Sequence, residues 1–151
     1  MRNIVPYLLI FLIGHMAVAT CYAGTNIYTW KSIQIAIPSN MIFQHKENMA
    51  IIATSTDNPS SFLVISKMNN LTSDDIIQHL QKNNHVVKIK EIKNTHIAKY
   101  DCIKIVYEHL IDKKVHISYL FDNYNIRLIY VGCYKDYKLY EPTINSLTIV
   151  N

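Results

Sequence analysis

The chain contains cysteine, histidine, serine and acidic residues, the side chains from which most catalytic and metal sites are built. Of its seven histidines, the six that follow His15 nowhere show the four-residue helical spacing of zinc enzymes. No paired-cysteine motif occurs either. His116 and Cys133, which we place on one sheet face, are the best candidates for metal ligands. We nevertheless expect scattered surface histidines, no metal site and no cofactor.

Catalytic motifs are equally scarce. Serines and carboxylates are plentiful, but there is no nucleophile elbow, phosphate loop or dinucleotide fingerprint. Only three glycines are present to build tight active-site turns. We therefore expect a protein that is not an enzyme. The alternative is a small secreted hydrolase or metal-dependent enzyme whose site is assembled from distant residues, which a deep polar pocket would favour.

Tyrosines are the most informative side chains for binding. A connection rich in lysine and tyrosine follows Cys133, and aromatic residues are enriched in protein interfaces. An alternative for Tyr137 and Tyr140 is that they pack a C-terminal helix onto a sheet. The candidate partner surface consists of Tyr124, Tyr134, Tyr137 and Tyr140.

The first 23 residues have the three parts of a cleavable secretory signal peptide. Arg2 supplies positive charge, a short apolar run follows, and the small residues Cys21 and Ala23 precede the cleavage site. We predict cleavage between Ala23 and Gly24 and a periplasmic or secreted protein. The apolar run is short for a bilayer core, which needs about 20 apolar residues. We therefore favour no stable membrane span after cleavage over a permanent anchor.

A lipoprotein is a further alternative, because Cys21 closes the apolar stretch and could be acylated. Thr20 stands where such sites favour glycine or alanine, which argues against it.

Composition limits the class of partner. Removal of 23 residues from the 151 would leave 128, enough for a single domain over residues 24–151. Removal of Arg2 would leave 14 basic against 11 acidic residues, a net charge of +3 with neutral histidines. The lysines are scattered, so we expect a solvated surface and no nucleic-acid partner. The abundance of isoleucine, asparagine and lysine indicates a low-GC genome, most simply that of a bacterium.

Hydrophobic periodicity outlines the elements that must position any site. Alternating isoleucines predict the first strand, and a polar segment between two β-branched runs predicts a hairpin. A Ser/Thr cap with two following acids predicts a helix, and Pro142 suits the start of another. The expected elements are strands at about 31–37, 50–54 and 62–67, a helix at 73–83, a strand from Val87 to a turn at 94–96, and a helix at 141–147.

The strongest signal lies in residues 99–133, where two short polar loops separate three apolar runs. This pattern predicts a three-stranded antiparallel meander. Matching the apolar faces sets the register, with Ile111 opposite Val115 and Phe121 opposite Ile126. One buried face would then carry Ile105, Tyr107, Ile117, Tyr119, Leu128 and Tyr130.

The meander also bears on the cysteines. In an oxidising compartment, Cys102 and Cys133 are candidates for a disulfide. The predicted register places them at opposite ends of the three strands, roughly 25–30 Å apart at about 3.3 Å per residue. Disulfides need α-carbons about 4–7 Å apart. We therefore expect two free thiols.

The order of elements resembles the Mog1/PsbP-like fold, including the DcrB-type envelope proteins of bacteria. Trp30–Pro38 resembles the opening strand of that family, which ends in proline, and Tyr140–Leu147 resembles its closing helix. The chain departs from the pattern at Ser39-Asn40-Met41, where glycine and tryptophan often follow the proline. The resemblance would cover residues 28–150. It implies a binding, assembly or chaperone role without a shared active site, so no catalytic residue is carried over.

Together these observations predict an α+β protein with an antiparallel sheet, a C-terminal meander, one central helix and a short C-terminal helix. The function we expect is that of a non-catalytic binding or accessory protein of the bacterial envelope, such as an assembly subunit, inhibitor or immunity protein. Its partner would be another envelope or secreted protein.

Overall fold

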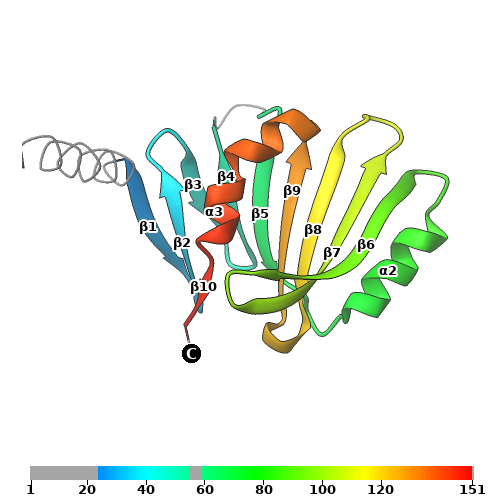
Figure 1. Ribbon diagram of the computed structural model, residues 1–151, viewed down its shortest axis with the longest axis horizontal. Helices are drawn as coiled ribbons and strands as arrows, with labels where there is room; N and C mark the ends of the chain where they lie inside the picture. Colours follow the sequence, from blue (N-terminus) through cyan, green and yellow to red (C-terminus); the bar gives the residue numbers. More distant parts are fainter. Residues whose placement is uncertain (1–23, 55–58, 151) are drawn as a thin grey trace, which may run out of the picture.

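The computed structural model describes residues 24–54 and 59–150 (Figure 1). The predicted signal peptide, with Cys21 and Ala23, lies outside these residues. The described chain is α+β, as predicted, and its paired strands are antiparallel. None of the helices in these two ranges is both long and apolar enough to cross a bilayer.

Strands make up most of the fold. Their bounds are β1 Thr25–Trp30, β2 Ile33–Pro38, β3 Ile42–His45, β4 Met49–Ala53, β5 Phe62–Lys67, β6 Val87–Ile97, β7 Tyr100–His109, β8 Val115–Phe121, β9 Ile126–Gly132 and β10 Thr148–Ile149. The helices are α2 Ser73–Lys82 and α3 Glu141–Asn145, with 3₁₀ segments η1 Asp122–Tyr124 and η2 Tyr134–Leu139.

The strands form two sheets. The small sheet has the order β1-β2-β10, and the large one β3-β4-β5-β9-β8-β7-β6. The strand predicted at about 31–37 is present as β2, although β1 precedes it and residues 31–32 form the turn between the two strands. The hairpin of β4 and β5 and both helices are confirmed. The turn predicted at 94–96 is wrong, because β6 continues to Ile97 and the chain reverses at Ala98, whose φ is +52°.

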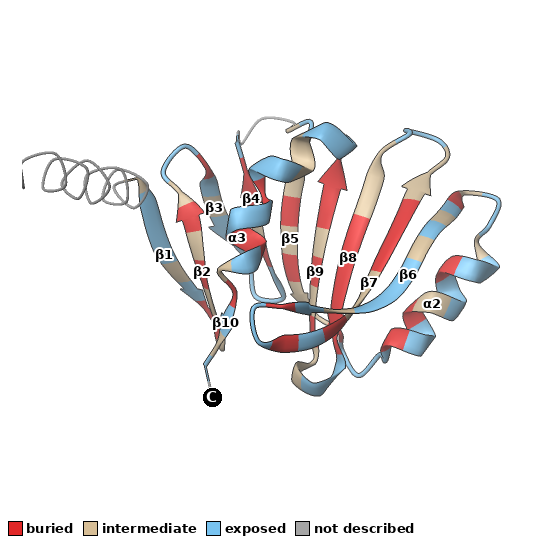
Figure 2. Cartoon of the chain, viewed as in Figure 1, coloured by how far each residue is buried: buried red, intermediate tan, exposed pale blue. Residues whose placement is uncertain are grey.

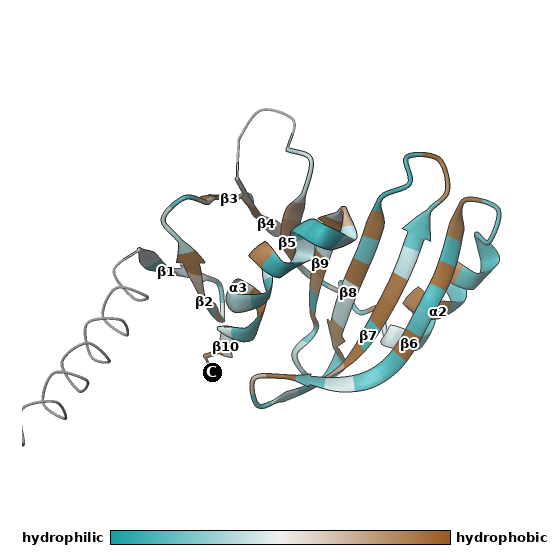
Figure 3. Ribbon diagram, turned by 45° about the horizontal axis from the view of Figure 1, so that its top comes forward, coloured by the Kyte–Doolittle hydropathy of each residue, from teal (hydrophilic) through white to brown (hydrophobic). Residues whose placement is uncertain are grey.

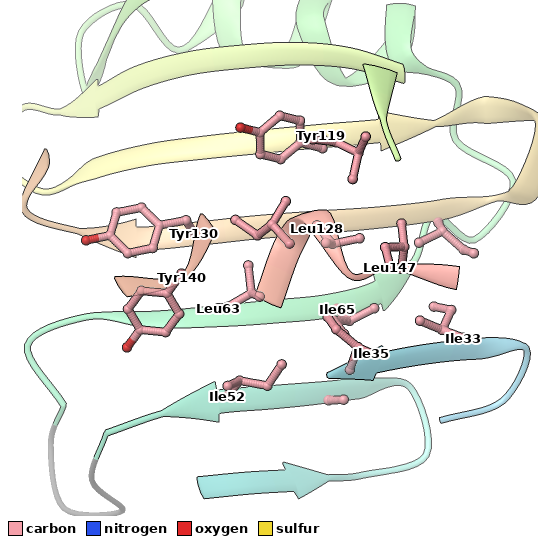
Figure 4. Close-up of a cluster of buried hydrophobic side chains, with 14 of the residues drawn as sticks. Ile33, Ile35, Ile52, Leu63, Ile65, Tyr119, Leu128, Tyr130, Tyr140 and Leu147 are labelled. Carbon is pink, nitrogen blue, oxygen red and sulfur yellow. The ribbon is translucent and has the colours of Figure 1, made fainter. Parts of the chain in front are cut away.

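The main core lies between the two sheets. Ile33 and Ile35 of β2 face Ile65 of β5 and Leu128 of β9, and Figure 4 shows these side chains together. Buried residues concentrate on the central strands of the large sheet (Figure 2). Each fully buried aliphatic side chain of this kind contributes about 1.5–3 kcal/mol to stability. We call the face of the large sheet toward β2 the inner face and the opposite one the outer face.

Helix α2 covers one end of the outer face. Figures 1 and 3 show it beside β6, and Figure 3 shows polar and apolar residues alternating along the neighbouring strands. Ile76 and Leu80 pack with Ile105, Tyr107 and Leu120 in a second hydrophobic cluster. This helix was predictable because its first turn is closed by local hydrogen bonds. The Thr72 hydroxyl accepts from the Asp75 N–H at 3.2 Å, and the Asp75 carboxylate accepts from the Thr72 N–H at 2.8 Å.

Replacement of Thr72 by alanine should therefore lower the free energy of unfolding by about 1 kcal/mol, the usual effect of losing an N-cap side chain. Urea denaturation followed by circular dichroism measures the change. Thr72→Ser keeps the hydroxyl and should be close to wild type. Equal losses for the two variants would show that the cap hydroxyl contributes nothing.

The predicted pairing of β7 with β8 is wrong by three residues. Val115 pairs with Glu108 instead of Ile111, and the His109 N–H donates to the Lys114 carbonyl at 2.9 Å to close a loop of residues 110–113. Ile105 and Tyr107 consequently lie on the outer face under α2, whereas the other four residues of the predicted face lie in the inner core. The pairing of Phe121 with Ile126 is confirmed.

The reason for this error is that both faces of the meander are covered. The register was chosen so that one face was apolar throughout, but α2 and the small sheet each bury one side. Apolar residues therefore occupy both faces of β7 and β8, and matching hydrophobicity does not distinguish the two registers.

Both described cysteines are free, as predicted. Cys102 adjoins Ile103, which pairs with Leu120, while Cys133 follows Gly132, which pairs with Val115. The corrected register still separates the cysteines by about seven residues along the sheet, or about 23 Å. The distance argument against a disulfide therefore holds despite the error in register.

Candidate protein-binding groove

A groove opens between the η2–α3 segment and the tip of the β6–β7 hairpin. Its volume is about 350 Å³. Lys104 of β7 and Tyr119 of β8 are contributed by the inner face of the large sheet, and the other residues by the two walls. The lining residues are Ile97, Lys104, Tyr119, Tyr134, Lys135, Tyr137, Lys138, Glu141 and Asn145.

Tyr140 fixes the η2–α3 wall to the large sheet. Its side chain has no exposed surface, and its hydroxyl donates to the Ser61 carbonyl at 2.8 Å. The ring lies 5.3 Å from that of Tyr130, and Figure 4 shows the two rings side by side. The Tyr130 hydroxyl donates in turn to the Cys133 carbonyl at 2.6 Å, just before η2 begins. These contacts fix the position of η2 and therefore of Tyr134 and Tyr137, which line the groove.

Gly132 is required where β9 meets this anchor. A Cβ at this position would lie 2.5 Å from both the Ser61 Cβ and the Tyr130 hydroxyl. Gly132→Ala should therefore force the surrounding core apart and lower the free energy of unfolding by about 1–3 kcal/mol. Chemical denaturation of the purified variant measures this loss. Gly24→Ala is a matched control, because its added Cβ would come no closer than 3.3 Å to the Ser39 hydroxyl. An undiminished stability of Gly132→Ala would contradict the packing described here.

Hydrogen bonds hold both walls in place. The Ser146 hydroxyl, just after α3, accepts from the Ala36 N–H of β2 at 2.8 Å. At the hairpin tip, the Tyr100 hydroxyl accepts from the Ile149 N–H of β10 at 2.8 Å. A partner would therefore meet a largely preformed groove, which lowers the entropic cost of binding.

The groove has an excess of positive charge. It is lined by three lysines and one glutamate, and Lys135 and Lys138 are exposed. Neither forms an ion pair with another described residue, whereas the Nζ of Lys104 lies 3.5 Å from the Oε2 of Glu91. Two cationic groups are thus available to an acidic ligand.

The groove tyrosines act as neutral hydrogen-bonding groups. The Tyr119 and Tyr137 hydroxyls are hydrogen-bonded to each other. Burial raises the pKa of Tyr119 well above its ordinary value, and the bond to Tyr137 raises it further. Burial also raises the pKa of Tyr137. Both phenols are therefore protonated at neutral pH and can bind a ligand without acting as bases.

The four tyrosines predicted as a partner surface do not lie together. Tyr134, which is 61% exposed, and Tyr137 line the groove. Tyr140 is buried and supports the wall, which corrects its assignment to an exposed surface and agrees with the packing alternative. Tyr124 follows β8 at the opposite end of β9, where its ring meets that of Tyr100 edge-on at 5.4 Å.

Sequence reasoning did not single out the groove lysines. A sequence pattern could have revealed these lysines. Tyr134, Tyr137 and Tyr140 follow one another at intervals of three residues, and so do Lys135 and Lys138. Three residues form one turn of a 3₁₀ helix, so each set follows one side of η2. The tyrosine side runs from the exposed Tyr134 to the buried Tyr140.

A second pocket, of about 440 Å³, bears on the enzymatic alternative. Its lining includes His96, Asp101, Cys102 and Asp122, residue types from which a hydrolase could be built. Strand alternation, however, places the Cys102 side chain in the inner core, on the opposite face from Asp101. Burial, and to a smaller extent the Asp101 charge, raises the pKa of the Cys102 thiol to about 11. A protonated, buried thiol is a poor nucleophile, so Cys102 is a poor candidate for the attacking group of this pocket.

Alkylation kinetics test this assignment. Because alkylation requires the thiolate, iodoacetamide at pH 7 should modify exposed Cys133 at least about tenfold faster than Cys102, whose reaction should accelerate as the pH approaches 11. Peptide mapping by mass spectrometry measures both rates, with the denatured chain as the control. Preferential modification of Cys102 at neutral pH would restore it as a candidate nucleophile.

Metal binding gains no support from the described geometry. In residues 24–54 and 59–150, no three histidine, cysteine or acidic side chains are grouped as a metal ion would require. The His116 ring stacks on Tyr107 with 4.8 Å between centroids, whereas Cys133 is exposed beyond the end of β9.

Comparison with known proteins shows the fold and no more. No family model and no curated protein matches the chain. It is similar to the crystal structure of a protein from Bacteroides thetaiotaomicron, with a TM-score of 0.51 and 16% identity over 86% of this chain and 49% of that one. This chain thus spans about half the length of that relative. A protein of unknown function from Pseudomonas aeruginosa, PA94, described as a putative regulator, matches with a TM-score of 0.42 and 13% identity over 80% of this chain and 90% of that one.

Proposed function

We propose that this chain is an exported, non-catalytic binding protein of the bacterial envelope, and that its groove binds an acidic segment of another envelope or secreted protein. The observation that carries the proposal is the groove itself, a preformed depression lined by three tyrosines and three lysines against one glutamate. Export rests on the predicted signal peptide, with cleavage between Ala23 and Gly24.

The chemistry of the lining suggests how the partner is recognised. Exposed Lys135 and Lys138 would pair with carboxylates, and the rings of Tyr134 and Tyr137 would provide large contact surfaces. Tyrosine is enriched among residues that dominate binding energy. The lysine ammonium groups lie at the rim, so their pairing should accelerate association and weaken as salt is added.

The proposal extends to the Mog1/PsbP-like fold of the DcrB type. In support, β2 ends at Pro38 and the small sheet packs on the large one. The segment from Tyr140 through α3 also packs against the large sheet, where the resemblance expects a closing helix. A binding, assembly or chaperone role fits this arrangement without an active site.

Charge reversal in the groove tests the function. The exported protein, purified with its partner from the cell envelope, should lose that partner in the Lys135→Glu/Lys138→Glu variant, with affinity reduced at least about tenfold. The matched control is Lys82→Glu/Lys88→Glu, which makes the same charge change at exposed positions near α2. Retention of the partner by the groove variant, or equal loss in both variants, would contradict a groove-specific site.

A further inference from the structure

A polar cluster around one cation, Arg127, lies on the outer face of the large sheet, opposite the inner face that contributes to the groove, and is not used by the proposed function. The Arg127 guanidinium extends from β9 across β8, where its Nη2 donates to the Ser118 hydroxyl at 3.3 Å and to the Tyr107 hydroxyl at 3.5 Å. His116 stacks on the other side of the cluster against the Tyr107 ring. Three strands therefore contribute to one polar site.

Arg127 lacks a counter-charge in the described part of the chain. None of the ion pairs formed by these residues includes it, and its Nε is buried without a hydrogen-bond partner. Burial lowers the pKa of the guanidinium from its usual value, although arginine stays charged at neutral pH. A largely buried cation whose contacts are two long bonds to neutral hydroxyls is costly, and an anion would offset that cost.

An apolar shelf adjoins this cluster. Ser118 pairs across the sheet with Ile129, Ile129 with Val64, and Val64 with Ile51, so these residues form one row on the outer face. In the neighbouring row, His116 pairs with Val131. Helix α2 covers only the opposite end of the outer face. The exposed fraction of Ile42 is 37% and that of Met49 is 40%. The shelf consists of Ile42, Met49, Ile51, Phe62, Val64 and Ile129, together with the buried residues Ala53 and Val131.

The dimensions indicate an elongated ligand. From β8 to β4 the shelf crosses three inter-strand spacings, or roughly 14 Å at about 4.8 Å each. One end carries a cation without a counter-charge, and the rest is apolar. The complementary molecule has one anionic head and one unbranched apolar tail.

We propose that the outer face binds a medium-chain fatty acid, with its carboxylate on Arg127 and its tail across the β9–β5–β4 shelf. Arginine suits this role because its planar guanidinium binds a carboxylate through two hydrogen bonds. His116 is half-buried beside the guanidinium, where it can contact the same head group, whereas Ser118 is fully buried and supports Arg127 from below. The acidic-peptide groove is separate, so either proposal can fail without the other.

Titration of the exported protein with dodecanoate below its micellar concentration tests this site. Methyl resonances of Ile129, Val64 and Ile51 should shift, whereas those of Leu63 and Ile65, on the inner face, should not. Two probes separate the contributions of head and tail. Acetate has the head alone, and dodecyltrimethylammonium has the tail with the opposite charge. Both should bind at least about tenfold more weakly than dodecanoate.

Two variants make the result decisive. Arg127→Gln should weaken dodecanoate at least about tenfold and leave dodecyltrimethylammonium unchanged, as measured by calorimetry. Ile51→Glu introduces a negative charge on the shelf and should also weaken dodecanoate, while Ile27→Glu, at a 75% exposed position in β1, should not. Unaltered dodecanoate affinity in Arg127→Gln would overturn the proposal. So would equal binding of the cationic amphiphile, or binding of acetate as tight as that of dodecanoate.

Discussion

Replacing Tyr140 by alanine should lower the free energy of unfolding by about 3–5 kcal/mol, the range for removal of a large buried aromatic ring. This side chain has no exposed surface, packs against Tyr130 and donates a hydrogen bond to the Ser61 carbonyl. Tyr140→Phe keeps the ring and loses only the hydroxyl, so it should cost about 1 kcal/mol.

Chemical denaturation followed by circular dichroism measures both Tyr140 variants. Tyr134→Ala is the surface control and should change stability by less than about 0.5 kcal/mol, because the Tyr134 side chain is 61% exposed. If Tyr140→Ala were as mild as Tyr134→Ala, Tyr140 would not anchor η2 and α3, and the groove would lose its support.

The second large effect concerns the register of β7. Ile105→Ala should cost about 2–5 kcal/mol, because Ile105 is fully buried beneath α2. Its loss should specifically loosen α2, so hydrogen exchange of the α2 amides should accelerate more than that of the α3 amides.

Ile117→Ala is the matched variant, since Ile117 is equally buried but lies in the inner core. It should accelerate exchange in α3 more than in α2. The same exchange pattern in both variants would contradict the assignment of Ile105 and Ile117 to opposite faces and would favour the register first predicted.

Several elements of the fold could be predicted from short-range patterns in the sequence. The capping box of Thr72 and Asp75 defines the start of α2, and the alternating isoleucines of β2 define its buried face. These features depend on residues only a few positions apart, so they can be recognised in the sequence without knowledge of the fold. By contrast, β1, β3 and β10 are short or largely exposed strands with little alternation, and they were not predicted.

The register of β7, and which tyrosines are buried and which exposed, depend on contacts between residues distant in sequence. Nothing within β7 reveals that α2 covers one of its faces. Likewise, Tyr134 and Tyr140 have the same side chain in the same segment, yet only the second meets Ser61, 79 residues away along the chain. The sequence therefore predicted a tyrosine-rich region as a candidate partner surface, and only the fold separates its exposed residues from those that are buried.

The most direct test of the proposed function is site-specific photo-crosslinking in bacterial cells that express this protein. A photoreactive phenylalanine analogue at Tyr134 samples what occupies the groove, and the same analogue at Leu71, a 53% exposed position just before α2, samples a distant surface. We predict an adduct from position 134, absent from position 71, whose cross-linked peptide is rich in aspartate and glutamate and comes from an exported protein. No adduct at position 134, or the same adducts from both positions, would contradict the account.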